Sequence, residues 1–418
     1  MIVLLFAFAA RAEIILHADY SDPDVIRVGD RYYLTSSSFA NVPGLPILES
    51  PDLKQWSLAG YAIERLPADF DRPQHGNGVW APSIRHHDGW FWIYFGDPDR
   101  GIYMTRARNA KGPWEPLTLV HAAKGWIDPC PLWDDDGQMY LVHAWARSRA
   151  GFNSVLHVNK LSADGKRVLD EGVMVFDGRE HHPTIEGPKF YKRNGWYYIF
   201  APAGGVKRGW QTVLRSKNVY GPYEPKIILE DGLHQGAWVD DWFVHFQDLG
   251  AYGRVVHRQR LRWVNEWPEI DVLESRDSGS ALLEDWQWQG NRTREPLPAN
   301  LWNTTNLLLQ KFPAPAFVAT ITVDSSSRRA GLVVFGMDYA ALVVDRGTLR
   351  RVTARDADKG GAEQELARVA VEGPVQLRVT VSPHAVARFS YRVERRASAR
   401  RYDGGLKPAA PQDEFTPL

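Results

Sequence analysis

Three acidic residues stand at the same distance from a recurring turn in this sequence. Asp22, Asp128 and Glu186 each precede the first residue of such a turn by eight positions. Carboxyls that share one site raise each other's pKa, and burial raises the pKa further. One carboxyl can then hold a proton as a general acid while another stays ionised as a base, which is the chemistry that hydrolyses a glycosidic bond. The spacing therefore predicts an acid–base site, provided that the fold brings these positions together.

The turns themselves mark an internal repeat. Each begins with Asp or Asn before an aromatic-rich segment, and the five turns begin at Asp30, Asp88, Asp136, Asn194 and Asp240. Asp-Gly and Asn-Gly pairs favour the type I′ turn of a β-hairpin, which needs positive φ at both central residues. Successive turns are 58, 48, 58 and 46 residues apart, and a four-stranded propeller blade needs roughly 40–50 residues. The repeat predicts a five-bladed β-propeller over residues 13–275, whereas the alternative, a β-sandwich, gives no reason for this period.

The innermost strand of each blade is the one before its hairpin, so residues at the start of these strands converge on the central channel. Trp80 holds the same offset as the acids, and His234 lies at a nearby place before the fifth turn. Taken singly, the Asp-Pro pairs at Asp22 and Asp128 are common turns and a histidine is more often a core residue. Because they share one position in the repeat, a catalytic site is favoured over separate structural roles. Asp22 and Glu186 would then lie on opposite walls about 6.5–9.5 Å apart, as in inverting glycosidases, and Asp128 would keep the pKa of the acid high.

Composition narrows the classes of function. The chain has 418 residues, with 50 Lys plus Arg, 50 Asp plus Glu and a formal net charge of zero. This balance removes the electrostatic argument for a nucleic-acid partner or an anionic membrane surface. The 17 Trp, 16 Tyr and 17 Phe can pack in a core or stack on sugar rings. Cys130 is the single cysteine, which excludes a disulfide framework, and no later run is long and apolar enough to span a bilayer.

The N-terminus is apolar. Residues 1–12 end in Ala10-Arg11-Ala12, a small-x-small pattern like that of a signal-peptidase site. We expect a signal peptide here and export to the periplasm or the extracellular space. A hydrophobic first strand is the alternative.

A second domain follows the repeat. Residues 276–306 are mixed and polar, so we expect a linker. Residues 307–418 contain short apolar segments between polar turns, among them 317–323, 331–336 and 375–381. This pattern predicts an antiparallel β-sandwich, although its Pro-rich tail shows no obvious closing strand. The whole chain is thus expected to be all-β, a propeller followed by a sandwich.

Several motifs of the first domain resemble those of glycoside hydrolase family 43. The matching segments are Tyr20–Ile26, Gly44–Ile47, Ser50–Trp56, Gly78–Ile84, Ile127–Pro129, Thr184–Pro188, His234–Val239 and Gly250–Arg254. The resemblance covers residues 14–275 and implies that Asp22 is the general base and Glu186 the general acid. It implies that Asp128 modulates the pKa of the acid and orients it, and that Arg254 touches substrate hydroxyls.

The resemblance extends to the channel and to the second domain. In that family the channel often holds a calcium ion or a water cluster beside a histidine, which is His234 here. Such a metal would be structural, and the chemistry requires no cofactor. The second domain resembles the concanavalin-like accessory domain of exo-acting xylosidases and arabinofuranosidases, which narrows the pocket to terminal residues.

Aromatic residues are further candidates for the substrate pocket. Phe39 could cap the sugar subsite and Trp80 could form its wall. Trp145 flanks a charged loop after the third hairpin, and Trp210 follows Gly204, whose missing side chain would let a sugar approach the backbone. Packing between blades is the alternative for each aromatic residue.

These features predict an inverting, exo-acting hydrolase that releases terminal α-L-arabinofuranose or β-D-xylose from arabinoxylan, arabinan or xylo-oligosaccharides. The motifs do not choose between the two pentoses. An endo-arabinanase would need an open groove, against which the accessory domain argues. A non-catalytic carbohydrate-binding propeller would lack or displace Asp22 or Glu186. Retaining sucrose- and fructan-cleaving propellers carry an Asn-Asp-Pro-Asn-Gly type of segment, where this chain has Ser21-Asp22-Pro23-Asp24.

Overall fold

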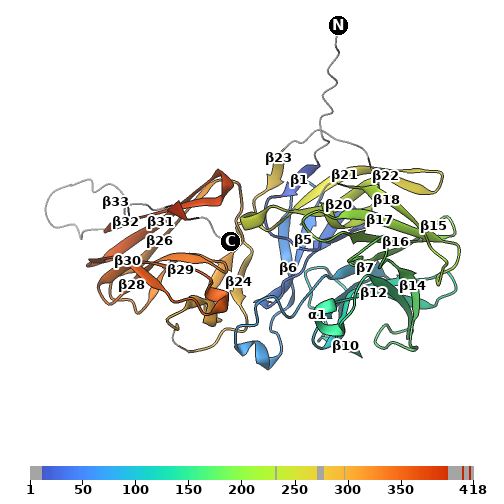
Figure 1. Ribbon diagram of the computed structural model, residues 1–418, viewed down its shortest axis with the longest axis horizontal. Helices are drawn as coiled ribbons and strands as arrows, with labels where there is room; N and C mark the ends of the chain where they lie inside the picture. Colours follow the sequence, from blue (N-terminus) through green and yellow to red (C-terminus); the bar gives the residue numbers. More distant parts are fainter. Residues whose placement is uncertain are drawn as a thin grey trace, which may run out of the picture.

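Two β-rich lobes lie side by side in the computed structural model, the larger built from the N-terminal part of the chain (Figure 1). The structure describes residues 12–230, 233–270, 277–295 and 297–393, and two short strands near the C-terminus. The predicted signal peptide, residues 1–12, lies outside these residues except for Ala12, so export stays a prediction.

Helices are few and short among the described residues. They are η1 (Ala68–Asp71), α1 (Arg147–Ala150), η2 (Gly250–Tyr252), η3 (Leu301–Asn303), η4 (Ala357–Lys359) and η5 (Pro383–Ala385), where η marks a 3-10 helix. In the described part of the chain none of them approaches the length of a membrane span.

Four antiparallel sheets of four strands form the first four blades of the larger lobe. From the innermost strand outward, they are β2 (Asp24–Val28), β3 (Arg31–Thr35), β5 (Gly44–Ser50) and β6 (Ser57–Ile63); β7 (Ser83–His87), β8 (Trp90–Asp97), β9 (Gly101–Ala107) and β10 (Thr118–Ala122); β11 (Trp126–Trp133), β12 (Met139–Trp145), β13 (Val155–Leu161) and β14 (Val173–Asp177); and β15 (Lys189–Arg193), β16 (Trp196–Ala203), β17 (Trp210–Ser216) and β18 (Glu224–Leu229). This repetition confirms the predicted propeller.

The fifth blade closes the ring with strands from both ends of the propeller. Its strands are β19 (Leu233–Val239), β20 (Trp242–Asp248), β21 (Arg254–Val264) and β1 (Glu13–Leu16), with β22 (Trp267–Ile270) paired to β21. Strand β1 runs antiparallel to β21, with Glu13 opposite Arg258. The ladder hydrogen bonds between them therefore hold the first and last blades together.

Two of the five hairpin turns have the type I′ geometry that Asp-Gly and Asn-Gly pairs favour. At Asp88-Gly89 the φ angles are 50° and 70°, and at Asn194-Gly195 they are 52° and 71°, as a type I′ turn requires. The third turn differs, because at Asp136-Gly137 only the glycine of the pair has positive φ, 81°, and its N–H bonds to the Asp134 carbonyl oxygen. Apolar side chains fill the space between blades, and Ile127 of the third blade and Ile199 of the fourth belong to one buried cluster. Each such side chain contributes about 1.5–3 kcal/mol by leaving water.

The expected linker, residues 276–306, differs from the prediction because parts of it join the sheets of the propeller. Strand β23 (Asp277–Ser280) runs parallel to β1, and β24 (Trp286–Gln289) pairs with both β4 (Asn41–Val42) of the first blade and β25 (Leu308–Gln310). The polar residues that suggested a linker make side-chain hydrogen bonds to the propeller: Gln287 donates to the Pro43 carbonyl oxygen at 2.7 Å. We call β4, β24 and β25 the seam.

Two antiparallel sheets form the smaller lobe, as predicted for a sandwich. One contains β26 (Phe317–Asp324), β31 (Pro374–Ser382), β32 (Val386–Val393), β33 (Lys407–Pro408) and β34 (Glu414–Phe415), and the other contains β27 (Ala330–Val334), β28 (Tyr339–Asp345), β29 (Thr348–Ala354) and β30 (Gln364–Ala370). Buried residues of both sheets, such as Leu342, Leu377 and Phe389, form its core. In the tail, where no closing strand was expected, β33 and β34 pair with β32.

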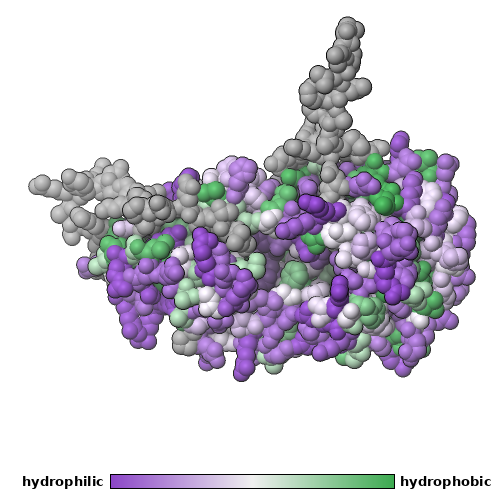
Figure 2. Space-filling model, viewed as in Figure 1, coloured by the Kyte–Doolittle hydropathy of each residue, from purple (hydrophilic) through white to green (hydrophobic). Residues whose placement is uncertain are grey.

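The surface of the face in view is mostly hydrophilic, with hydrophobic residues scattered over both lobes, and it is hollowed where the lobes meet (Figure 2).

Candidate active site

The five innermost strands, β2, β7, β11, β15 and β19, surround a region that we call the hub. Strand β2 contacts β7 and β19, and β11 contacts β7 and β15. Asp22 precedes β2, Asp128 lies within β11, and Glu186 precedes β15. The fold therefore places the three acids at equivalent positions of the first, third and fourth blades.

Asp22 is buried and held by two donors. Ser37 Oγ donates to Asp22 Oδ2 at 2.6 Å, and Arg254 Nη1 donates to Asp22 Oδ1 at 2.7 Å. Its φ of 55° lies in the left-handed region, which Asp tolerates better than most residues. With both oxygens used as acceptors, the carboxylate has one fixed orientation.

Asp128 is buried, with a φ of 57°, and its surroundings favour the protonated form. Burial, the carboxyl of Glu186 and the carboxyl of Asp22, in that order, raise its pKa well above the ordinary value. The Gly187 N–H, which donates to Asp128 Oδ2 at 2.7 Å, and the ammonium of Lys189 act in the opposite direction. The three acids are thus close enough to interact electrostatically.

Glu186 is less deeply buried than the two aspartates. Its backbone N–H donates to the Pro202 carbonyl oxygen at 3.1 Å, sixteen residues on, and the Trp80 N–H donates to the Gly96 oxygen at 2.9 Å with the same separation. This shared backbone contact places Trp80 and Glu186 at equivalent positions of the second and fourth blades, as their spacing predicted.

Arg254 lies beside the acids at the start of β21. Besides Asp22 it interacts electrostatically with the carboxyls of Asp19 and Glu186, and its backbone N–H donates to Asp19 Oδ1 at 2.9 Å. Sequence reasoning missed Ser37 and Asp19, because neither holds the repeat phase that singled out the acids.

The other pocket candidates are placed as follows. The Trp80 indole N–H donates to the Gly76 oxygen at 2.7 Å, and Phe39, with a φ of 51°, pairs with Val79 through an isolated bridge. Trp145 donates from its indole N–H to His157 Nδ1 at 3.0 Å. These contacts fix the three aromatic residues locally, and a role in binding sugar stays a prediction.

Gly204 is closely packed in the structure. A Cβ atom on Gly204 would lie 2.4 Å from the ring of Trp210, so this ring occupies the space that a side chain would need. The ring is half-buried against the core of the third and fourth blades. Close packing of Trp210 and a φ of 81° both favour glycine here, and the approach of a sugar to this backbone stays a prediction.

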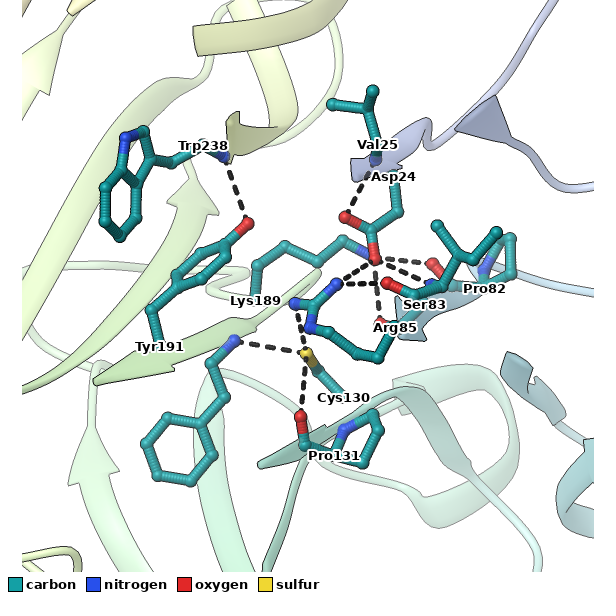
Figure 3. Close-up of polar contacts among 12 residues, drawn as sticks. Asp24, Val25, Pro82, Ser83, Arg85, Cys130, Pro131, Lys189, Tyr191 and Trp238 are labelled. Carbon is teal, nitrogen blue, oxygen red and sulfur yellow. Dashed lines mark hydrogen bonds and ion pairs between the residues drawn. The ribbon is translucent and has the colours of Figure 1, made fainter. Parts of the chain in front are cut away.

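A network of polar contacts joins the inner strands of the first four blades at the hub, and a separate hydrogen bond joins the fourth blade to the fifth (Figure 3). The network contains Asp24 on β2, Pro82, Ser83 and Arg85 at the second blade, Cys130 on β11 and Lys189 on β15. Separately, the hydroxyl of Tyr191 on β15 accepts the Trp238 N–H of β19. The middle of the hub is therefore filled by charged side chains.

The charged network of the hub does not itself offer a calcium site, and an ion beside His234 stays a prediction. Calcium takes six to eight oxygen ligands, whereas the hub holds the cations of Arg85 and Lys189 with the single carboxylate of Asp24. Within the described residues no group of three or more His, Cys, Asp or Glu is placed to hold a metal. The side chain of His234, the suggested metal neighbour, lies outside the described residues.

Fold and site together define a class: a five-bladed propeller whose inner strands carry three interacting acids, followed by a β-sandwich. Residues 12–268 match the family described as glycosyl hydrolases family 43, and residues 283–405 match the β-xylosidase C-terminal concanavalin A-like domain. The chain belongs to glycosyl hydrolase family 43. The second match begins within the segment that was expected to be a linker.

Relatives carry the names of two related activities. The chain is 42% identical over 341 residues to a protein of Xylanibacter ruminicola provisionally named a β-xylosidase, with 70% of this chain and 62% of that protein aligned. It is 32% identical over 217 residues to a non-reducing end α-L-arabinofuranosidase of Bacteroides ovatus, with 50% and 39% aligned. The chain thus spans between 39% and 62% of the length of these two relatives.

The fold is shared with solved structures. One is the xylan β-1,4-xylosidase of Bacillus halodurans C-125, with a TM-score of 0.78, 20% identity and coverage of 97% of this chain and 95% of that one. At this identity the likeness shows the fold alone, and it covers both lobes.

Proposed function

We propose that this chain is an inverting, exo-acting glycosidase that releases terminal β-D-xylose or α-L-arabinofuranose from hemicellulose-derived oligosaccharides. The observation that carries the proposal is the grouping of Asp22, Asp128 and Glu186, in which one buried carboxyl has a strongly raised pKa and another is fixed by a serine and an arginine. Such asymmetry among neighbouring acids is typical of acid–base sites.

In the mechanism that follows, Glu186 gives its proton to the glycosidic oxygen as the bond to the anomeric carbon breaks. Asp22, oriented by Ser37 and Arg254, takes a proton from the water that attacks the same carbon from the opposite face. One bond to oxygen breaks and one forms, so the product has the inverted configuration. Asp128, which is buried and interacts electrostatically with the carboxyl of Glu186, helps to orient the acid.

Contacts between the lobes support action at chain ends. The hydroxyl of Tyr252, two residues before Arg254, donates to the Pro315 carbonyl oxygen at 2.8 Å and accepts the Ala385 N–H at 2.7 Å. The sandwich therefore touches the propeller next to an arginine of the proposed pocket. A wall at this place would leave room for a terminal sugar and hinder passage of a long polymer.

The test compares initial rates on an aryl β-D-xyloside and an aryl α-L-arabinofuranoside, with the first-formed anomer followed by NMR. We expect turnover of at least one substrate and an inverted product. Turnover of neither, with binding of xylo-oligosaccharides retained, would favour a carbohydrate-binding propeller. A product that keeps the configuration of the substrate would contradict the assigned roles of Asp22 and Glu186.

A further inference from the structure

Lys189 is a fully buried lysine at the hub, 0% exposed, three residues after Glu186. Its Nζ donates to the Pro82 carbonyl oxygen at 2.5 Å and to Ser83 Oγ at 3.2 Å, and lies 3.8 Å from Asp24 Oδ2. A buried ammonium is costly unless it is paired and hydrogen-bonded. Lys189 therefore carries a desolvation penalty at the centre of the propeller, which suggests that its charge has a role.

The carboxylate of Asp24 is shared by two cations, because Arg85 pairs with it as well as Lys189. Arg85 Nη1 donates to Asp24 Oδ2 at 2.6 Å, and the Ile84 N–H donates to the same oxygen at 2.9 Å. Arg85 Nη2 donates to Cys130 Sγ at 2.8 Å (Figure 3). Two cations and one carboxylate leave the hub with a net charge of about +1, since arginine stays protonated in proteins.

This excess charge lies next to the proposed acid–base site through short stretches of chain. Gly187, whose N–H bonds to Asp128, comes two residues before Lys189. Cys130, which accepts from Arg85, comes two residues after Asp128. The hub and the proposed acid–base site are therefore built on the same two segments of chain, β11 and the residues that lead into β15.

We propose that Lys189 is a positioning residue whose buried charge, shared with Asp24 and Arg85, sets the ionisation of the pocket acids from beneath. It does not touch substrate and acts through Asp128. The inference rests on the proposed function, because it concerns the acids that perform it.

The other groups that face Lys189 are few. The described charged and titratable side chains around it are Asp24 on β2, Arg85 on β7, Asp128 and Cys130 on β11, and Tyr191 on β15, whose hydroxyl accepts the Trp238 N–H of β19. Among them Asp128 is the carboxyl without a cation in hydrogen-bond contact, so it is the group most free to respond to a change in hub charge.

The first variant is Lys189→Met, which removes the charge and keeps most of the volume. Loss of a positive charge disfavours ionised carboxylates, so both limbs of the kcat/KM–pH profile should move to higher pH, by about one unit. The second variant is Asp24→Asn, which removes a negative charge from the same contact. It should move both limbs to lower pH.

The matched control is Lys192→Met on the same strand, three residues further on. Lys192 is partly exposed and pairs with Asp134 and Asp135 at the rim of the blade. We expect its profile to overlay that of the wild type. The positions of the limbs do not depend on how much enzyme is folded, so moderate destabilisation leaves the measurement valid.

Opposite shifts from Lys189→Met and Asp24→Asn would establish the electrostatic role, because a purely structural role would lower the rate at every pH without moving either limb. Unshifted limbs, shifts in the same direction, or failure of both variants to fold would overturn the inference in favour of a structural role. If only one variant folds, the direction in which the limbs of its pH profile move decides whether the inference holds. An inactive wild type would instead defeat the proposed function, which separates the two failures.

Discussion

Two buried aspartates of this chain have opposite electrostatic surroundings: Asp128 lies in β11 at the hub, and Asp285 lies directly before β24 of the seam. Asp128 accepts one backbone N–H, from Gly187, and faces the carboxyls of Glu186 and Asp22. Burial and these negative neighbours raise its pKa well above the ordinary value. Asp128 is therefore poorly compensated as an anion.

Asp285 is as deeply buried, at 2% exposed against 5% for Asp128, yet it is fully compensated. The hydroxyl of Tyr20 donates to it at 2.8 Å, that of Tyr61 at 2.7 Å, and the ammonium of Lys311 contacts it as well. Burial alone would raise its pKa, but the Lys311 charge and these hydrogen bonds lower it below the ordinary value.

The difference separates an acid kept for chemistry from an acid kept for structure. A raised pKa means that the native state binds a proton that the unfolded state has lost, so stability falls as pH rises through that range. A lowered pKa has the reverse effect: the stabilisation is present above the unfolded pKa and is lost as pH falls through the folded pKa. Asp128 should thus cost stability at neutral pH, while Asp285 contributes to it.

The largest expected effect is the loss of turnover when either proposed proton-transfer group is removed. Glu186→Gln and Asp22→Asn should each lower kcat by about 10³-fold, because general acid–base catalysis contributes roughly 10²–10⁴-fold. Sugar binding and the circular dichroism spectrum should change little. Stopped assays on an aryl pentoside with calorimetric binding provide the measurement, and a near-normal rate in either variant would reject its assigned role.

The next largest effect is expected at Asp128, where one substitution should lower kcat and raise the thermal stability. Asp128→Asn should lower kcat by roughly 10–100-fold, since the amide cannot take up or release a proton beside Glu186 and Asp22 as the carboxyl can. It should also raise the thermal unfolding midpoint at pH 7 by roughly 2–5 °C, because a buried, uncompensated carboxyl is gone. The gain should shrink toward pH 4, where Asp128 is protonated in the native state and the unfolded chain approaches its pKa of about 3.9. A lower midpoint at pH 7 would show that Asp128 is structural after all.

The two aspartates also differ in how visible they are in the sequence. Asp128 could be predicted because a repeat fold copies its geometry, so that the eight-residue offset shared with Asp22 and Glu186 becomes proximity in space. The number of blades followed from the same turns.

Asp285 could not be predicted, because its partners are Tyr20 and Tyr61, 265 and 224 residues away, and no repeat relates them. The polar composition of its segment indicated a linker, and polarity alone does not show whether hydrogen bonds go to water or to another blade. Lys189 was missed for a similar reason, since a lysine at the start of a strand gives no sign that it is buried at the hub.

The smallest expected effect on activity tests the structural side of the comparison. Asp285→Asn should leave kcat within about threefold, because Asp285 contacts none of the pocket acids in the described hydrogen bonds, but it leaves the ammonium of Lys311 without its carboxylate. Breaking a buried pair in this way costs about 3–5 kcal/mol, less here because Lys311 also donates to Gln287. The midpoint at pH 7 should therefore fall by roughly 5–10 °C.

That deficit should narrow as pH falls below about 4, because the wild type then loses the stabilisation of ionised Asp285 while the variant has none to lose. Melting curves of both proteins between pH 7 and pH 3 provide the measurement, with Lys311→Met as the matched variant at the same contact. If instead Asp285→Asn melts like the wild type and loses most of its kcat, the seam would transmit the state of the sandwich to the pocket. Compensation of a buried acid would then no longer distinguish structural from catalytic carboxyls in this chain.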